Sequence, residues 1–222
     1  MAGLTLAMDA AAGAGTIAVL RDGVVVAERT VAMRSGDDER FLPAVLETLG
    51  AADASVRAVA RIVCGAGPGS FTALRVVGAC AKGLAFGGGA PLCAVPSLAL
   101  IVAGSDATRA AGSRWLATLD AMRGDRYLAL VTIGPAGALA TVESLGLAPA
   151  TEVAARAAAL QATPIGPGED LDAAPHARGT ARCAALIHAA GPVALGSWEP
   201  VYGRLAEAQV KWEAAQGRPL DR

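Results

Sequence analysis

The sequence predicts a two-lobed α/β fold with mixed sheets, and three observations support this prediction. Short apolar segments alternate with segments whose apolar residues recur every three or four positions, which is typical of strands and helices in one domain. Near the N-terminus, three expected strands are followed by helix, strand and helix. A similar order then starts again. We therefore expect an N-terminal lobe at residues 1–97, a degenerate second lobe at 98–198 and a C-terminal segment at 199–222.

The first lobe opens with three expected strands. Leu4–Met8 is a short apolar run of strand length, and Thr16–Leu20 has the same character. Asp22-Gly23 is a strong hairpin signal because both residue types tolerate positive φ. The strand-forming residues Val24–Val31 follow it. Three strands joined by two turns predict an antiparallel meander.

The next elements change period. Between Ser35 and Gly50 the apolar residues share one helical face, which predicts a helix that begins close to Asp38 with Pro43 in its first turn. We then expect a buried strand at Val56–Cys64, a glycine-rich loop at Gly65–Ser70, a helix at Phe71–Phe86 capped by Ser70, an edge strand at Pro91–Val95 and a helix at Ser97–Ala103. A meander followed by a crossover is the element order of the ribonuclease-H-like half of an actin-like fold.

The second half repeats this order in a weaker form. The expected elements are strands at Trp115–Leu119, Tyr127–Ile133, Ala138–Val142 and Thr163–Gly166, and helices at Thr151–Gln161 and Thr180–Ala190, with Thr151 as a cap. Two halves with one element order predict a duplicated, actin-like, two-lobed fold.

The composition excludes several classes of protein. The 19 basic and 20 acidic residues give a net charge of −1, which excludes a generally basic nucleic-acid coat. Glycines and prolines interrupt the uncharged stretch at 85–104, so we expect no membrane span. The four cysteines form no C-x-x-C pair, and the two histidines form no H-E-x-x-H motif, so we expect no metal site. We expect a cytoplasmic protein with reduced thiols.

The glycine-rich loop and two aspartates are candidates for a phosphate or nucleotide site. Gly67, Gly69 and Ser70 lie between a strand and a helix, where free backbone N–H groups can face an anion. Asp9 and Asp120 end corresponding strands of the two halves, where a carboxylate could hold Mg²⁺. The other interpretation is structural: glycines needed for close packing and aspartates bonded to nearby backbone. The residues leave both interpretations open.

Two expected helices are candidates for a partner-binding surface. Gly78 and its small neighbours would permit close approach of another helix, and Arg75 and Lys82 lie on one side of the same helix. The other interpretation is that both helices only cover their own sheet and that the charges are solvated.

Several segments resemble the bacterial TsaB (YeaZ) family. Gly67–Arg75 reads G-P-G-S-F-T-A-L-R and closely resembles the family hallmark G-P-G-S-F-T-G-L-R. Further similar segments lie at Leu6–Asp9, Ala18–Gly23, Glu39–Pro43, Ala81–Ala85, Asp120–Tyr127 and Glu199–Tyr202, the last matching an E-P-x-Y motif. The resemblance spans nearly the whole chain.

The resemblance implies an actin-like, non-catalytic subunit in the synthesis of threonylcarbamoyladenosine in tRNA. It implies pairing with the catalytic paralogue TsaD, with the small ATPase TsaE joining, tRNA handled by the complex, and a homodimer when alone. The implied partner interface comprises Phe41, Leu42, Val45, Leu46, Phe71, Thr72, Leu74, Arg75, Gly78 and Lys82. It implies no catalytic residue and no firm cofactor, with ATP or ADP and Mg²⁺ entering at the level of the complex.

The sequence departs from the family pattern in the first turn and in the hallmark. Ala10 and Ala11 follow Asp9 where the family has hydroxyl residues, Asp37 replaces a histidine, and Ala73 replaces a glycine. These departures weaken the nucleotide-binding interpretation. An ATP-dependent phosphotransferase of the actin-like superfamily is the alternative, and a metallopeptidase, suggested by an old glycoprotease label of the family, is a distant third.

Overall fold

The computed structural model describes residues 2–33, 40–203 and 216. A first sheet of five strands has the order β3-β2-β1-β4-β5. Its strands are β1 (Leu4–Asp9), β2 (Ala14–Arg21), β3 (Val24–Ala32), β4 (Val59–Gly65) and β5 (Leu92–Val95). The first three strands pair antiparallel, whereas β4 pairs parallel to both β1 and β5. The sheet is therefore mixed, as predicted.

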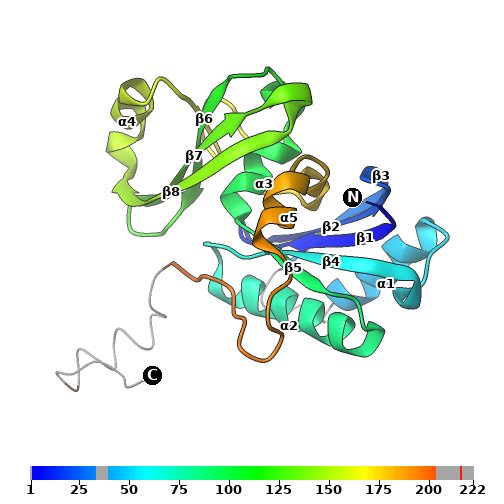
Figure 1. Ribbon diagram of the computed structural model, residues 1–222. Helices are drawn as coiled ribbons and strands as arrows, with labels where there is room; N and C mark the ends of the chain where they lie inside the picture. Colours follow the sequence, from blue (N-terminus) through cyan, green and yellow to red (C-terminus); the bar gives the residue numbers. More distant parts are fainter. Residues whose placement is uncertain (1, 34–39, 204–215, 217–222) are drawn as a thin grey trace.

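Two helices, α1 (Phe41–Ala51) and α2 (Phe71–Gly88), cover one face of the first sheet (Figure 1). Both helices contribute to one apolar cluster with the strands beneath them. The periodicity predicted α1 correctly from Phe41 onward; its expected start at Asp38 lies outside the described residues. The side chain of Ser70 makes no capping hydrogen bond to α2, contrary to expectation.

A second sheet of four strands has the order β8-β7-β6-β9 and is also mixed. Its strands are β6 (Arg114–Asp120), β7 (Asp125–Ile133), β8 (Leu139–Pro149) and β9 (Thr163–Ile165), with α4 (Val153–Ala159) beside them. Two mixed sheets with associated helices confirm the predicted fold class.

Helix α3 (Ser97–Gly104) is buried along its whole length. Its residues share one apolar cluster with strands of both sheets. Its sequence, S-L-A-L-I-V-A-G, is apolar on every side, and such a helix needs apolar contacts all round. The 3₁₀ helix η5 (Ala177–Arg182) packs against α3, and α5 (Ala184–Ala190) follows it.

Several predicted boundaries were wrong, each for a local reason. Strand β8 extends to Pro149, beyond the expected end at Val142, because it is an exposed edge strand held by hydrogen bonds to β7 rather than by an apolar pattern. The helix expected at Thr180–Ala190 is divided into η5 and α5. The strand expected from Val56 begins with a 3₁₀ turn, η1 (Val56–Ala58). The helix expected from Thr151 begins with a second 3₁₀ turn, η4 (Ala150–Glu152), and Thr151 does not act as its capping residue.

Candidate functional site

Asp9 lies fully buried at the end of β1. One carboxylate oxygen accepts a hydrogen bond from the backbone N–H of Ala11 at 2.9 Å, and the other accepts one from the hydroxyl of Ser97 at 2.5 Å. Burial raises the pKa of this carboxyl above its ordinary value, although both hydrogen bonds oppose the increase. Gly65 is a close neighbour, and any Cβ at this position would collide with the Asp9 carboxylate. The carboxylate is therefore enclosed by the chain itself.

The glycine-rich loop packs against the turn that follows β1. The backbone N–H of Ser70 donates to the carbonyl oxygen of Ala11 at 2.8 Å, and a Cβ at Gly69 would collide with the same carbonyl. The N–H of Gly67 donates to the Ser97 hydroxyl at 2.9 Å. Gly67 and Gly69 both have positive φ, so these positions need glycine for conformation as well as for space.

These contacts favour the structural interpretation of the loop over phosphate binding. A phosphate cradle needs backbone N–H groups directed at an empty space. Here the N–H groups of Ala66, Gly67 and Ser70 are all donated to acceptors within the chain. Magnesium held with nucleotide phosphates needs a carboxylate that reaches solvent or ligand, which Asp9 does not. The residues at this position do not fit an Mg–ATP complex.

Asp120, the corresponding aspartate of the second sheet, is in a different environment. It is exposed at the end of β6, and its carboxylate accepts a hydrogen bond from the N–H of Met122 at 3.1 Å. Met122 and Arg123 both have positive φ, which makes this a strained turn for residues other than glycine. The structure shows no contact that joins Asp120 to the Asp9 group among the described residues.

The candidate partner residues divide into two sets by their burial. Phe41, Val45 and Leu74 are at most 1% exposed and face the sheet. They position the two helices and are not available to a partner. Leu42 and Leu46 point outward from α1, at 42% and 50% exposure.

Helix α2 presents a continuous outward stripe. Apart from Phe71 and Gly87, the exposed residues of α2 follow one another at spacings of three or four positions, which places them on one helical face. They are Thr72, Arg75, Ala79, Gly83 and Phe86. Phe86 is 86% exposed, which is unusual for a large aromatic side chain. From Thr72 to Phe86 the stripe rises along the helix by roughly 21 Å at 1.5 Å per residue.

Gly78 and Lys82 do not belong to this outward stripe. A Cβ at Gly78 would lie 3.1 Å from Cγ of Pro200, and Lys82 donates from Nζ to the carbonyl oxygen of Trp198 at 3.0 Å. Both residues face the C-terminal part of the same chain. Figure 1 shows this part of the chain passing beside α2. The contact between Lys82 and Trp198 was not predicted, because no local sequence pattern indicates a contact across more than 100 residues.

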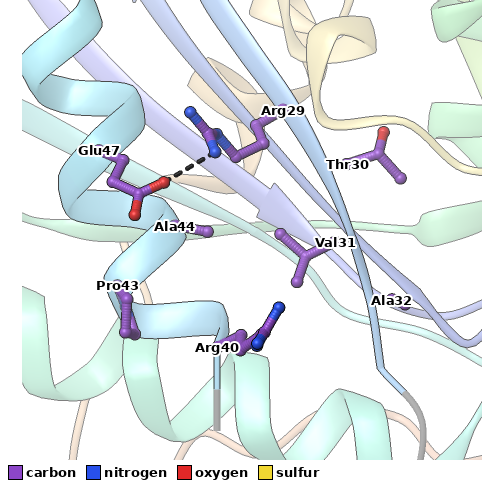
Figure 2. A pocket seen from close by; sticks show the side chains of 8 residues that line it. All are labelled: Arg29, Thr30, Val31, Ala32, Arg40, Pro43, Ala44 and Glu47. Atoms are coloured by element: carbon purple, nitrogen blue, oxygen red, sulfur yellow. Dashed lines mark ion pairs between the residues drawn. The ribbon is translucent and has the colours of Figure 1, made fainter. Parts of the chain in front are cut away.

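A shallow depression of about 440 Å³ lies between β3 and the start of α1 (Figure 2). Arg29 and Glu47 form an ion pair of 2.7 Å at its rim, and both side chains are well exposed. The other lining residues are Thr30, Val31, Ala32, Arg40, Pro43 and Ala44. No sequence pattern indicated this depression, and its lining includes no residue of the glycine-rich loop.

Within residues 2–33 and 40–203, no group of three or more histidine, cysteine, aspartate or glutamate side chains is placed to hold a metal ion. No helix in the same ranges is both long and apolar enough to span a membrane. Cys64, Cys93 and Cys183 are buried free thiols.

Comparison with known sequences gives consistent matches. A family model described as TsaD, tRNA N6-adenosine threonylcarbamoyltransferase, matches residues 35–140. A curated relative from Escherichia coli (strain K12), the tRNA threonylcarbamoyladenosine biosynthesis protein TsaB, is 35% identical over 124 residues, covering 56% of this chain and 53% of the relative. The protein of the same description from Bacillus subtilis (strain 168) is 35% identical over 98 residues, covering 44% and 43%. The chain thus spans about half the length of the curated relatives it matches.

Solved structures match over a greater length. A crystal structure from Pseudomonas aeruginosa, described as an uncharacterized protein with similarity to peptidase YEAZ, has a TM-score of 0.75 and 28% identity, covering 92% of this chain and all (100%) of that chain. A structure described as YeaZ from Pseudomonas aeruginosa has a TM-score of 0.68 and 24% identity, covering 91% and 100%. The second likeness shows the fold alone.

Proposed function

Because the chain is similar to TsaB proteins over about half of their length and to a YeaZ-like structure over its whole length, we propose that it belongs to the TsaB (YeaZ) family and is a non-catalytic scaffold and activator in the synthesis of threonylcarbamoyladenosine in tRNA. Its proposed partner is a TsaD-like catalytic paralogue, with a TsaE-like ATPase joining the pair and tRNA handled by the assembled complex. The proposed location is the cytoplasm. In the absence of these partners, we propose that the chain forms a homodimer through helices α1 and α2.

The observation that carries this proposal is the outward face of α1 and α2. Leu42, Leu46 and Phe86 are large apolar side chains left in solvent on two helices that already have a buried apolar face. The small residues Ala79 and Gly83 are exposed on α2, where another helix can approach closely. We propose that the partner covers these apolar side chains, which lie on two helices that pack on one apolar cluster.

The enclosed environment of Asp9 supports a non-catalytic role. The Asp9 carboxylate and the N–H groups of Ala66, Gly67 and Ser70 form hydrogen bonds within the chain, so these groups are already occupied at the position that would serve an ATP-dependent phosphotransferase. This observation does not favour the phosphotransferase alternative.

The first experiment is a binding measurement with the purified catalytic paralogue. Leu46→Glu and Ala79→Glu place a charge in the centre of the proposed interface, and we expect each to weaken binding at least about tenfold, or about 1.4 kcal/mol. Val24→Glu is the matched control, because Val24 is 67% exposed on the edge strand β3. All three variants should unfold at the wild-type temperature. Wild-type affinity in both helix variants would refute this interface.

The second experiment measures the activity of the complex. The catalytic paralogue, the small ATPase, threonylcarbamoyl-adenylate, ATP and tRNA are combined with and without this chain, and modified adenosine is quantified. We expect repeated turnover only when the chain is present. Equal product in its absence would refute the activating role.

A further inference from the structure

The C-terminal segment at residues 198–203, which we call the clamp segment, contacts two separate parts of the fold. It includes Glu199–Tyr202, the E-P-x-Y motif that the proposed function does not use. On one side it lies along α2 and the loop before it; on the other it reaches β7 of the second sheet. Its contacts are therefore suited to holding these parts in one arrangement.

On the α2 side, the clamp segment contacts both halves of the helix. Tyr202 packs on Phe71 in the first turn, with ring centroids 4.6 Å apart and an interplanar angle of 51°, a favourable geometry for an aromatic pair. Pro200 lies against Gly78, about two turns further along the helix, where a Cβ would be 3.1 Å from the proline ring. The Lys82 ammonium donates to the Trp198 carbonyl at 3.0 Å.

The clamp segment also joins the glycine-rich loop to the second sheet. The N–H of Val201 donates to the carbonyl oxygen of Ala66 at 2.7 Å, and a Cβ at Gly67 would collide with the Val201 carbonyl. The Tyr127 hydroxyl on β7 donates to the Tyr202 carbonyl at 3.2 Å. Gly203 has positive φ and lies so close to the Tyr127 ring that any Cβ would collide with it.

We propose that the clamp segment is a conformational device that locks α2 and the glycine-rich loop to the second sheet and thereby maintains α2 in its partner-binding position. The effect on binding rests on the proposed function; the locking itself does not. The contacts of the segment on α2 are with Phe71, Gly78 and Lys82, and none of these residues belongs to the outward stripe. Releasing it should therefore disturb the partner surface without altering a residue of that surface.

Hydrogen exchange of the full chain tests the locking. Gly203→Ala introduces a Cβ into the Tyr127 ring, and Tyr202→Ala removes the ring that packs on Phe71. We expect the Val201 amide, and amides in the first turns of α2, to exchange at least about tenfold faster in both variants. Gly196→Ala is the matched control, because a Cβ there would have no heavy atom within 4 Å. Unchanged exchange in both variants, with wild-type melting temperatures, would overturn the proposal.

The second arm measures binding to the catalytic paralogue with the same proteins. We expect Gly203→Ala and Tyr202→Ala to weaken binding about tenfold, equivalent to about 1.4 kcal/mol, and Gly196→Ala to bind as wild type. Faster exchange with wild-type affinity would overturn the link between the clamp segment and the partner surface. If the wild-type protein itself does not bind the paralogue, the proposed function fails, and the exchange measurements still decide whether the segment locks the fold.

Discussion

Arg182 provides the most direct test of the energetic reasoning, because its guanidinium is buried and donates to many acceptors. The residue is 8% exposed at the end of η5. Its nitrogens donate at 2.5–3.2 Å to the carbonyl oxygens of Val102, Ala103, Ser105, Thr108 and Gly137 and to the hydroxyl of Thr108. Three of these carbonyls lie at or just beyond the C-terminal end of α3, and those of Val102 and Ser105 also accept from the Thr108 hydroxyl.

Replacing Arg182 by alanine removes the guanidinium donor from each of these carbonyls, of which those of Val102 and Ser105 keep the Thr108 hydroxyl. A buried polar group without a partner costs about 1–3 kcal/mol, and hydrogen bonds from charged groups lie toward the upper end of that range. The contributions are not additive, so we expect Arg182→Ala to lower the free energy of unfolding by about 3–5 kcal/mol. For a domain of this size that is a decrease in melting temperature of roughly 6–20 °C.

Thermal and urea unfolding measure this effect, with a second arginine of η5 as control. Arg178 is 45% exposed, donates to the Gly104 carbonyl at 2.9 Å and pairs with Glu28 at 3.4 Å. We expect Arg178→Ala to cost about 1 kcal/mol. Arg182→Lys keeps the charge but has three donors in place of five, and should fall between wild type and Arg182→Ala. A loss below about 1 kcal/mol for Arg182→Ala, with two-state unfolding, would refute the reasoning.

Three further predictions concern substitutions at Asp9, Gly69 and Thr180. Burial raises the pKa of Asp9, so the folded protein binds the proton more tightly than the unfolded chain, and stability falls as pH rises from about 3.8, the ordinary pKa, toward the raised value. Asp9→Asn should therefore gain stability relative to wild type over that interval, measured by urea unfolding at several pH values. Gly69→Ala should lose at least about 2 kcal/mol in urea unfolding, because its Cβ would collide with the Ala11 carbonyl at a positive φ. Thr180→Val, which removes a buried hydroxyl without a hydrogen-bond partner, should be neutral or stabilising by about 1 kcal/mol in the same assay.

For each of these predictions, one experimental outcome would contradict it. A constant difference between Asp9→Asn and wild type across pH would show that the Asp9 pKa is not raised by burial. A stable Gly69→Ala variant would show that the loop has room to move away from Ala11; Gly83→Ala, which has open space at its Cβ position, is the control. A large loss of stability in Thr180→Val would show that the hydroxyl has a partner.

Local patterns predicted most of the elements because each pattern depends on neighbouring residues. The meander, the glycine-rich loop and α2 follow from apolar runs, turn residues and helical spacing. Strand β8 was predicted too short because an edge strand is held by backbone pairing with β7, which no side-chain pattern records. The division into η5 and α5 was missed because the sequence carries no glycine or proline at Cys183 to indicate a break.

The candidate sites were predicted less completely than the fold. The apolar residues of α1 occupy both its buried and its outward face, so spacing alone grouped the buried Phe41 and Val45 with the exposed Leu42 and Leu46. Ser97, which joins Asp9 to the N–H of Gly67, showed no distinguishing pattern in the sequence. Its role depends on α3 beginning beside the end of β1.

The sequence by itself determined the fold class, the order of the elements and the family hallmark at Gly67–Arg75, because these depend on residue types at short and regular spacings. Only the tertiary structure decided which side chains are available. It placed Asp9 in an enclosed environment, directed Gly78 and Lys82 toward the C-terminal segment, and left the α2 stripe in solvent. The physical reason is that these outcomes depend on contacts between residues far apart in the chain, such as Lys82 with Trp198 and Tyr127 with Tyr202, and local periodicity carries no information about which distant segment covers a given face.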